Sequence, residues 1–234
     1  LSINGFIINN CYYRTNINTI MKIQRILLAD DHGFIRLGLI QLLQDEFPMV
    51  QIKQVGDGES LVKEVMQGDW DLVISDLDMP GRSGLEALEQ IKLLKPELPV
   101  LILSIYPEEL YAVRALKAGA SGYMNKNSAP EELITAVNRI AMGKKYISPE
   151  TAERLMDQEN TVKHPHELLS NRELEIFKLL ALGRTITQIA ESLNLALTTV
   201  STHRSRIMDK IGLSTNSELT RYAIAHHIIT DISQ

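Results

Sequence analysis

The first half of the chain alternates between short apolar runs and longer amphipathic stretches. From Met21 onward, short runs, of which RILLA, LVIS and VLILS are the most apolar, are separated by segments whose apolar residues recur every three or four positions. Continuous runs are typical of buried parallel strands, and the wider spacing is typical of helices packed on a sheet. The pattern predicts an α/β fold, a doubly wound parallel sheet of five strands with helices on both faces. The expected strands are Arg25–Ala29, Gln51–Val55, Leu72–Ser75, Val100–Ser104 and Gly122–Asn125, and the expected helices are residues 33–44, 58–67, 84–95, 108–118 and 130–142.

The second half of the chain has only the helical spacing. We therefore expect a separate all-α domain at residues 167–234, after a first domain at residues 21–142. Between them, residues 143–166 contain charges and prolines without a continuous apolar period, and are predicted to be a linker in which Pro149–Met156 forms one short helix. Residues 1–20 have no period either, and are expected to be a disordered N-terminal extension. The four expected helices of the second domain are residues 170–182, 186–193, 198–212 and 216–228.

Charge is distributed unevenly between the two halves. The chain has a net charge of −5, but residues 21–142 hold 18 acidic against 12 basic residues, whereas residues 168–234 hold 6 against 7. The acidity belongs to the first part, so the second part is compatible with binding nucleic acid. Cys11 is the single cysteine, which excludes a disulfide within the chain and favours a reducing compartment. No apolar run approaches the roughly 20 residues that span a bilayer, and we expect a cytoplasmic protein without a membrane partner.

Polar residues directly follow four of the five expected strands. They are Asp30 and Asp31 after the first strand, Asp76 after the third, Ser104 at the end of the fourth and Lys126 after the fifth. In open α/β sheets, ligands bind outside the carboxyl ends of the strands, so these side chains are expected to meet at one edge. Taken singly, each residue has an ordinary structural explanation, such as a solvated turn or a surface lysine. Their joint placement predicts a functional site.

The chemistry of this cluster follows from its charges. Three converging carboxylates repel one another, so they call for a hard divalent cation, and oxygen ligands favour Mg²⁺. A metal-bound carboxylate that faces an ammonium group can accept a phosphoryl group, because both cations neutralise its oxygens during transfer. Asp76, after the central strand, is the expected nucleophile, and Ser104 is placed to hydrogen-bond the resulting phosphate.

Residues 21–142 resemble the receiver domain of bacterial response regulators, which has a flavodoxin-like sheet. The resemblance implies that an aromatic switch accompanies the switch hydroxyl, and that a backbone carbonyl joins the metal ligands. Two departures are the acid at Asp78 and the absence of the frequent proline after Lys126, where this chain has Asn127. The implied assignments are Asp30, Asp31, Asp76 and the Asp78 carbonyl for the metal, Asp76 as phosphoacceptor within DLDMPGRSG, and Ser104, Tyr123 and Lys126 for the switch and phosphate contacts.

A rival interpretation comes from the segment VISDLDMP, which also resembles the first motif of haloacid-dehalogenase-type phosphohydrolases. In those enzymes Asp76 would be a catalytic nucleophile and Asp78 an acid/base. Their acidic pair comes last in the chain, however, whereas here it comes first, and Pro80 stands where a threonine or valine is expected. The order of the residues favours the receiver domain.

The second domain contains two short amphipathic segments joined by a compact turn. In a helix-turn-helix, one helix braces a second whose polar residues enter the major groove. Short hydroxyl side chains can contact bases or phosphates, and Arg and Lys are phosphate anchors or guanine readers. The residues expected to face DNA are Thr199, Ser201, Thr202, His203, Arg204, Ser205, Arg206 and Lys210.

Nearly all of residues 168–230 resemble the LuxR-type DNA-binding domain of the NarL/FixJ family. Within the matching segment, the pair Arg172–Glu173 is expected to brace the helices, and His203 is expected to pack or to touch phosphate. One departure is Ala196, where the family often has a serine that caps the recognition helix. Its loss costs about 1 kcal/mol unless Thr198 caps a helix that starts later.

Together the two resemblances imply a two-component response regulator. A sensor histidine kinase would phosphorylate Asp76, a change of packing at Ser104 and Tyr123 would follow, and a homodimer would bind inverted half-sites in promoter DNA. The protein would not be an enzyme beyond its own phosphorylation and dephosphorylation. A phosphohydrolase and a DNA-binding regulator that needs no phosphorylation are the alternatives left open.

Overall fold

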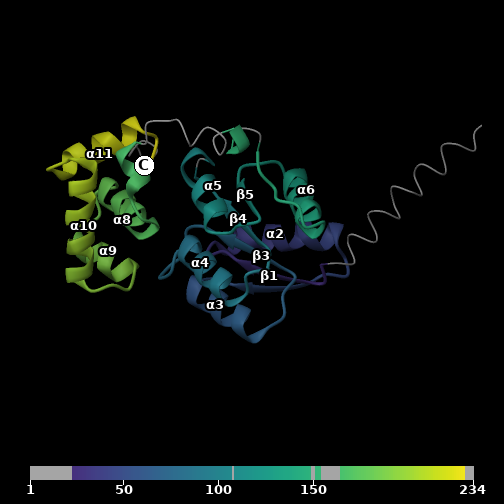
Figure 1. Cartoon of the computed structure of the whole chain (residues 1–234). Coiled ribbons are helices and arrows are strands. Elements are labelled where there is room, and N and C mark those ends of the chain that lie inside the picture. Colours follow the sequence, from purple (N-terminus) through teal and green to yellow (C-terminus); the bar gives the residue numbers. More distant parts are fainter. Residues whose placement is uncertain (1–22, 107, 149–150, 154–163, 230–234) are drawn as a thin grey trace, which may run out of the picture. The chain divides into compact units, whose positions relative to one another are not determined.

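The computed structural model describes residues 23–106, 108–148, 151–153 and 164–229, and the expected extension at residues 1–20 lies outside this range. The described residues fall into two compact units, the first ending at residue 153 and the second beginning at residue 164 (Figure 1). Among the described helices, none has the length and apolar character needed to cross a membrane.

The first unit is built on a five-stranded sheet, which confirms the predicted fold class. All neighbouring strands are parallel, in the order β2-β1-β3-β4-β5. The three central strands are almost completely buried, as expected for a sheet covered on both faces. The strands are β1 (Arg25–Ala29), β2 (Gln51–Val55), β3 (Leu72–Asp76), β4 (Val100–Ser104) and β5 (Gly122–Asn125).

Helices cover both faces of this sheet. Helices α2 and α6 lie on one face, while α3, α4 and α5 lie on the other (Figure 1). Alternate strand residues, such as Ile26, Ile74 and Leu101, pack in one core with Leu43 of α2 and Val137 of α6. The helices end within two residues of their expected limits: α2 (Gly33–Glu46), α3 (Gly58–Gln67), α4 (Gly84–Leu94), α5 (Glu108–Lys117) and α6 (Pro130–Ala141).

The connection from β3 to α4 is shaped by a glycine. A Cβ atom on Gly84 would lie 2.1 Å from the backbone oxygen of Asp76, so only glycine lets α4 start this close to the strand end. The Gly84 amide donates to the carbonyl of Leu77 at 2.8 Å, and the Ser83 hydroxyl caps α4 by accepting from the Glu86 amide at 3.3 Å. The segment after Asp76 is therefore held in a tight turn beside the sheet edge.

The first residues of the expected linker pack on the first unit. The Tyr146 amide donates to the carbonyl of Ser121 at 2.9 Å, and Tyr146 pairs with Gly122 at the open edge of β5. The hydroxyls of Ser148 and Thr151 both donate to the Glu108 carboxylate at the start of α5. Residues 151–153 are helical; the rest of the short helix expected at Pro149–Met156 lies outside the described residues.

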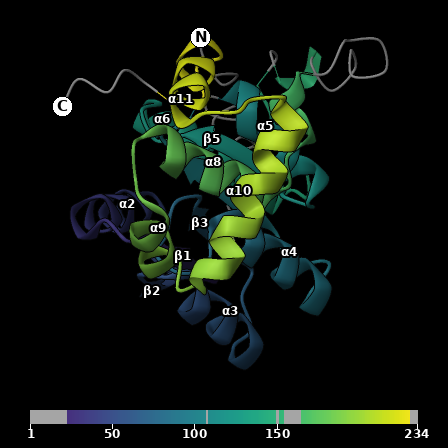
Figure 2. The same ribbon diagram turned by 90° about the vertical axis from the view of Figure 1, so that its left-hand side faces the viewer.

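The second unit contains the four expected α-helices. Helix α10 packs on α8, α9 and η1, and α11 packs on α8 (Figure 2). Helices α8, α9 and α11 each begin with a capping box, formed at Ser170, Thr185 and Thr215. The elements are η1 (Pro165–Leu168), α8 (Asn171–Ala181), α9 (Ile186–Ser192), α10 (Leu197–Ile211) and α11 (Asn216–Ala225).

Three local expectations in this unit need correction. Helix α10 begins at Leu197 with Ala196 in the capping position, so Thr198 does not cap a later start. Helix α11 ends at Ala225 instead of residue 228, because the chain turns through a positive φ of 53° at His227. Residues 165 and 166, the end of the expected linker, are part of η1 together with residues 167 and 168, and His166 is buried.

Candidate functional site

Two buried carboxylates and one ammonium group meet at the carboxyl edge of the sheet. The strand register places Ala29 beside Ser75, Asp76 beside Leu103 and Ser104 beside Asn125, so the polar residues that end these strands come to one edge. Lys126 Nζ lies 2.6 Å from Asp30 Oδ2 and 2.6 Å from Asp76 Oδ2. Asp30 is 1% exposed and Asp76 is 4% exposed. The structure thus brings together residues that are 50 and 96 positions apart.

Burial and charge act in opposite directions on this cluster. Burial raises the pKa of Asp76 to about 6, even though the hydrogen bond and charge of Lys126 act to lower it; the charge of Asp30 adds to the rise. Burial alone would lower the pKa of Lys126, but its hydrogen bonds to Asp30 and Asp76 outweigh that effect and raise it. One ammonium group therefore serves two carboxylates, which leaves the cluster short of positive charge.

Asp31 and His32 complete the cluster on its solvent side. One ligand atom from each of Asp30, Asp31, His32 and Asp76 can be chosen so that all four lie within 4.8 Å of one another. This donor set, three carboxylates and an imidazole, fits a divalent cation. His32 was not singled out from the sequence. The feature of the sequence that could have identified His32 is its position directly after Asp30 and Asp31, at the same strand end.

Ser104 and Tyr123 are connected through one loop residue. The backbone amide of Tyr106 donates to Ser104 Oγ at 3.1 Å, and the Tyr123 hydroxyl donates to the Tyr106 carbonyl at 3.0 Å. Ser104 is completely buried, and Tyr123 is 1% exposed. The two predicted switch residues thus hold the same backbone segment. Tyr106 was missed in the sequence because a loop residue carries no periodic signal.

The acid at Asp78, a departure from the family pattern, is used for a contact outside the carboxylate cluster. Asp78 Oδ2 accepts a hydrogen bond of 2.6 Å from the Tyr106 hydroxyl, and the Asp78 amide donates to Asp76 Oδ1 at 3.2 Å. The loop after β3 and the loop after β4 are therefore tied together through Tyr106.

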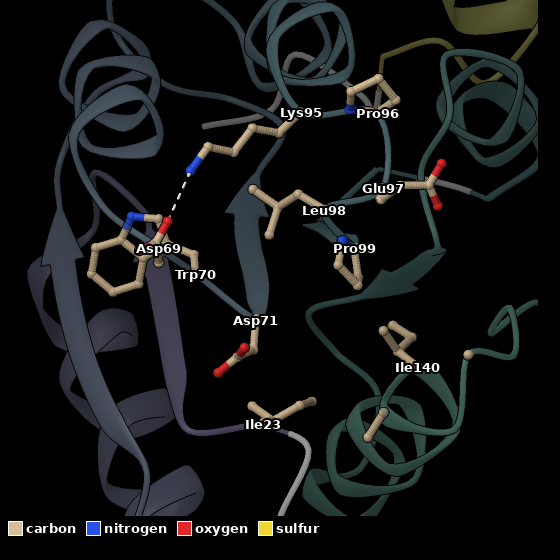
Figure 3. Close-up of a pocket in the computed structure, with 12 residues that line it drawn as sticks. Ile23, Asp69, Trp70, Asp71, Lys95, Pro96, Glu97, Leu98, Pro99 and Ile140 are labelled. Carbon is tan, nitrogen blue, oxygen red and sulfur yellow. Dashed lines mark ion pairs between the residues drawn. The ribbon is translucent and has the colours of Figure 1, made fainter.

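A separate hollow lies at the opposite, amino-terminal edge of the sheet. It has a volume of about 620 Å³, and its lining includes Ile23, Trp70 and Leu98 (Figure 3). Two of its acids have partners: Asp69 lies 3.7 Å from Lys95 Nζ, and Asp71 accepts hydrogen bonds from the backbone amides of Gln24 and Arg25. The candidate site is the carboxylate cluster at the other edge.

Helices α9 and α10 form a helix-turn-helix in the second unit. Helix α10 packs on α9; its buried residues include Val200, Ile207 and Ile211, and Ile189 and Leu193 are buried as well. The residues expected to face DNA lie mainly on the other side. Ser201, Thr202, Ser205, Arg206 and Lys210 are exposed, and Thr199, His203 and Arg204 are half-buried.

Two of the basic residues have protein partners in this unit. Lys210 Nζ lies 2.6 Å from Glu173 Oε2, and Glu173 is only 4% exposed. Arg204 donates to Asn216 Oδ1 at 2.9 Å from Nη2. Arg172 pairs with Glu175 at 2.7 Å and donates to the carbonyl of Leu193, which agrees with the bracing expected near the Arg172–Glu173 pair. Lys210 takes part in this bracing through its ion pair with Glu173.

Burial alone would raise the pKa of Glu173. Hydrogen bonds from Lys210 and Ser170 outweigh burial and lower it. The carboxylate therefore stays charged inside the helical unit, where it joins the start of α8 to the end of α10.

Comparison with known proteins gives two family matches that together span both units. Residues 26–138 match the response regulator receiver domain, and residues 167–223 match the bacterial regulatory proteins of the luxR family. The chain is 36% identical to the oxygen regulatory protein NreC of Staphylococcus carnosus over 214 residues, which cover 88% of this chain and 99% of that one. It is 32% identical to the response regulator UvrY of Escherichia coli, over 86% of this chain and 94% of that one.

Among solved structures, the chain is similar to RcsB from Salmonella enterica serovar Typhimurium. That structure holds RcsB bound to the promoter P1flhDC in the presence of the phosphomimetic BeF3⁻. The TM-score is 0.63 and the sequence identity is 26%, over 86% of this chain and 98% of that chain.

Proposed function

Because the chain belongs to the NarL/FixJ family of two-component response regulators, we propose that phosphorylation of Asp76 by a sensor histidine kinase controls its binding to promoter DNA. The observation that carries the proposal is the Lys126 ammonium group held 2.6 Å from both Asp30 and Asp76 at the carboxyl edge of the sheet. An anionic group that binds there meets a positive charge already in place.

In the proposed reaction, an Asp76 oxygen attacks the phosphorus of a phosphohistidine on the kinase. The new O–P bond forms as the P–N bond breaks, and the electron pair leaves with the imidazole, which takes up a proton. Mg²⁺, held by Asp30, Asp31, Asp76 and the Asp78 carbonyl, would supply positive charge to the phosphoryl oxygens. Lys126 supplies the same kind of stabilisation from the protein side.

The new phosphate then acts on the segment that follows β4. Ser104 Oγ accepts a hydrogen bond of 3.1 Å from the Tyr106 amide. If the Ser104 hydroxyl rotates to donate to a phosphate oxygen, this hydrogen bond to Tyr106 changes. Tyr123 and Asp78 both bond to Tyr106 and are drawn into the change. This loop leads into α5, so the rearrangement reaches a surface on which a second copy can dock.

For the second unit, we propose that α10 enters the major groove of DNA. Its exposed hydroxyl and basic residues would contact bases and phosphates, and two copies would read inverted half-sites. RcsB, a similar protein of known structure, was solved bound to the promoter P1flhDC. The role is transcription regulation in the cytoplasm, without catalysis beyond the protein's own phosphorylation and dephosphorylation.

The direct test is phosphate uptake from acetyl phosphate in Mg²⁺, followed by intact-protein mass spectrometry. Wild type should take up one phosphate and Asp76→Ala none. Asp69→Ala is the matched control, since this carboxylate is 98% exposed at the opposite edge of the sheet, and it should be labelled like wild type. Equal labelling of Asp76→Ala would refute the assignment of the phosphoacceptor.

The same proteins separate the remaining alternatives. Multiple turnover of small phosphoesters by wild type would favour a phosphohydrolase. Full promoter occupancy by Asp76→Ala, measured by footprinting with and without acetyl phosphate, would favour a DNA-binding regulator that needs no phosphorylation. We expect neither result.

A further inference from the structure

We propose that His32 is a nitrogen ligand at the carboxylate cluster, so that this site prefers a transition-metal dication such as Mn²⁺ or Co²⁺ over Mg²⁺. The inference rests on the proposed function, because it concerns the divalent ion of the same phosphoacceptor site. It adds a residue, His32, and a preference among cations.

The backbone fixes His32 beside the carboxylates. His32 occupies the capping position of α2, directly after Asp31, and its amide donates to Asp30 Oδ1 at 2.7 Å. Two further bonds hold the turn: the Arg36 guanidinium donates to the Asp30 carbonyl, and the Arg36 amide donates to the His32 carbonyl at 3.0 Å. The imidazole therefore starts from an anchored position at the rim of the cluster.

The ring nitrogen faces the carboxylate oxygens. His32 Nδ1 lies 2.7 Å from Asp31 Oδ1 and 3.6 Å from Asp30 Oδ1. Together with Asp30, Asp31 and Asp76, His32 also belongs to the group in which one ligand atom of each residue lies within 4.8 Å of the others. Two ligands bound to one ion at about 2.1 Å each lie no more than about 4.2 Å apart. Small rotations of exposed side chains bring these atoms into that range.

The cluster has two different sides. Lys126, whose side chain is 6% exposed, occupies the inner side between Asp30 and Asp76. His32 is 61% exposed and Asp31 is 33% exposed, so both lie on the solvent side. An ion that enters from solvent meets Asp31 and His32 first. With Nδ1 bound to the ion, the exposed Nε2 carries the ring proton.

Ligand type then decides which ion is favoured. Mg²⁺ takes oxygen ligands and loses its water reluctantly, so an imidazole adds little to its binding. First-row transition ions accept imidazole nitrogen together with carboxylate oxygen, and their affinities rise from Mn²⁺ to Co²⁺ at a given nitrogen and oxygen site. A cluster of carboxylates alone would discriminate less between these ions.

The test is pulsed electron paramagnetic resonance of the full chain loaded with Mn²⁺, which detects the ¹⁴N nucleus of a bound imidazole. Wild type should show ¹⁴N modulation, and His32→Asn should lose it; asparagine is also a good capping residue, so α2 should keep its start. His226→Asn is the control, because His226 lies in a separate group of imidazole rings with His164 and His166. It should keep the signal. Persistence of the modulation in His32→Asn would overturn the proposal.

Calorimetric titrations give the second measurement. The ratio of the Mg²⁺ to the Mn²⁺ dissociation constant should fall about tenfold in His32→Asn. An unchanged ratio would overturn the stated preference. The proposed function is judged separately, by phosphate uptake of wild type and Asp76→Ala in Mg²⁺. Wild type that takes up phosphate but shows no ¹⁴N modulation refutes the role of His32 alone, whereas ¹⁴N modulation without phosphate uptake refutes the proposed function alone.

Discussion

At the scale of single residues, the protein destabilises the charged form of Asp76 relative to the protonated form. Its carboxylate is almost completely buried and shares one ammonium group with Asp30, so burial outweighs the attraction of Lys126 and raises its pKa to about 6. The ionised Asp76 carboxylate is destabilised when no cation is bound. Binding of a metal ion is favoured because its positive charge offsets this destabilisation.

The first prediction concerns the stability of the metal-free protein. A shift in pKa from 3.8 to about 6 corresponds to about 3 kcal/mol at most. Because the folded-state pKa is raised, the stabilisation from protonated Asp76 is complete below pH 3.8 and is lost as the pH rises through 6. In EDTA at pH 7.5, Asp76→Asn should therefore unfold at higher urea than wild type.

This advantage of Asp76→Asn should shrink as the pH falls from 7.5 to 5. Urea unfolding followed by circular dichroism at each pH measures it, and Asp69→Asn serves as the exposed control without an advantage. Equal stability of wild type and Asp76→Asn throughout this range would contradict the assigned burial penalty.

Residues at strand ends could be predicted from the sequence, whereas their loop neighbours could not. The apolar runs that mark the strands, and the rule that ligands bind outside the carboxyl ends of parallel strands, bring Asp30, Asp76 and Lys126 to one edge without knowledge of the loops. The contacts of His32 and Tyr106 depend on the path of the backbone after a strand, and that path is set by turn geometry and packing.

At the scale of elements, the helical unit has an α-helix without a side-chain cap, α10, and an ion pair between Lys210 and the buried Glu173. Helices α8, α9 and α11 begin with hydroxyl caps, whereas the Ala196 methyl group at the start of α10 cannot accept a hydrogen bond. The backbone of Ala196 is extended, with φ −69° and ψ 144°, and would accommodate a capping serine.

The second prediction follows from this start. Ala196→Ser should stabilise the second unit by about 1 kcal/mol, which raises its melting temperature by about 4–8 °C. Thr185→Ala is the opposite control, because it removes the hydroxyl that accepts from the Gln188 amide at 3.2 Å and should destabilise the unit by a similar amount. Calorimetric unfolding of both variants makes the comparison. A melting temperature unchanged by Ala196→Ser would show that the helix end needs no cap.

The third prediction separates bracing from DNA contact on α10. Lys210→Ala leaves the Glu173 carboxylate without its ion pair and should destabilise the second unit by about 1–3 kcal/mol. The Glu173 pKa is lowered in the folded state, so this contribution is present above about pH 4.5 and is lost below it. The difference between wild type and Lys210→Ala should therefore diminish in acid.

Arg206→Ala is the matched variant on the exposed side of α10. It should leave the free energy of unfolding within about 0.5 kcal/mol of wild type, and it should weaken DNA binding and reduce its salt dependence. Urea unfolding and binding titrations at several salt concentrations test both variants. If Lys210→Ala unfolds like wild type but binds DNA with reduced salt dependence, Lys210 contacts DNA instead of stabilising the helical unit.

Apolar periodicity predicted the helices of both units to within about three residues, because packing on a core sets their length. It did not predict η1 or the pairing of Tyr146 with the edge of β5. Those contacts use backbone groups and single aromatic or imidazole side chains, which leave no repeating pattern.

At the scale of the whole molecule, the first residues after α6 are hydrogen-bonded to α5, the helix that follows the Tyr106 loop. Thr151 is 2% exposed, its hydroxyl donates to Glu108 Oε2 at 2.9 Å, and Ser148 donates to the same carboxylate. Glu108 opens α5, two residues after Tyr106. The linker thus starts from the part of the receiver that is proposed to move.

The fourth prediction tests this attachment. Thr151→Val keeps the shape of the side chain but loses a hydrogen bond to a charged group, which is worth about 1.5–3 kcal/mol. Amide hydrogen exchange should become faster at residues 146–148 and 151–153, and protease cleavage after α6 should accelerate. Thr135→Val is the control, since Thr135 is exposed on α6 and bonds only within its helix. Equal exchange rates in Thr151→Val and wild type would refute the attachment.

The bond between Lys126 and Asp30 joins residues 96 positions apart, and this distance along the chain has a consequence for biosynthesis. A ribosome releases β1 and β3 long before β5, and parallel strands pair only after slow, non-local closure. A nascent or truncated chain therefore has both carboxylates but lacks the ammonium group that completes the site. On the proposed function, a chain that ends before Lys126 should therefore not be phosphorylated at Asp76.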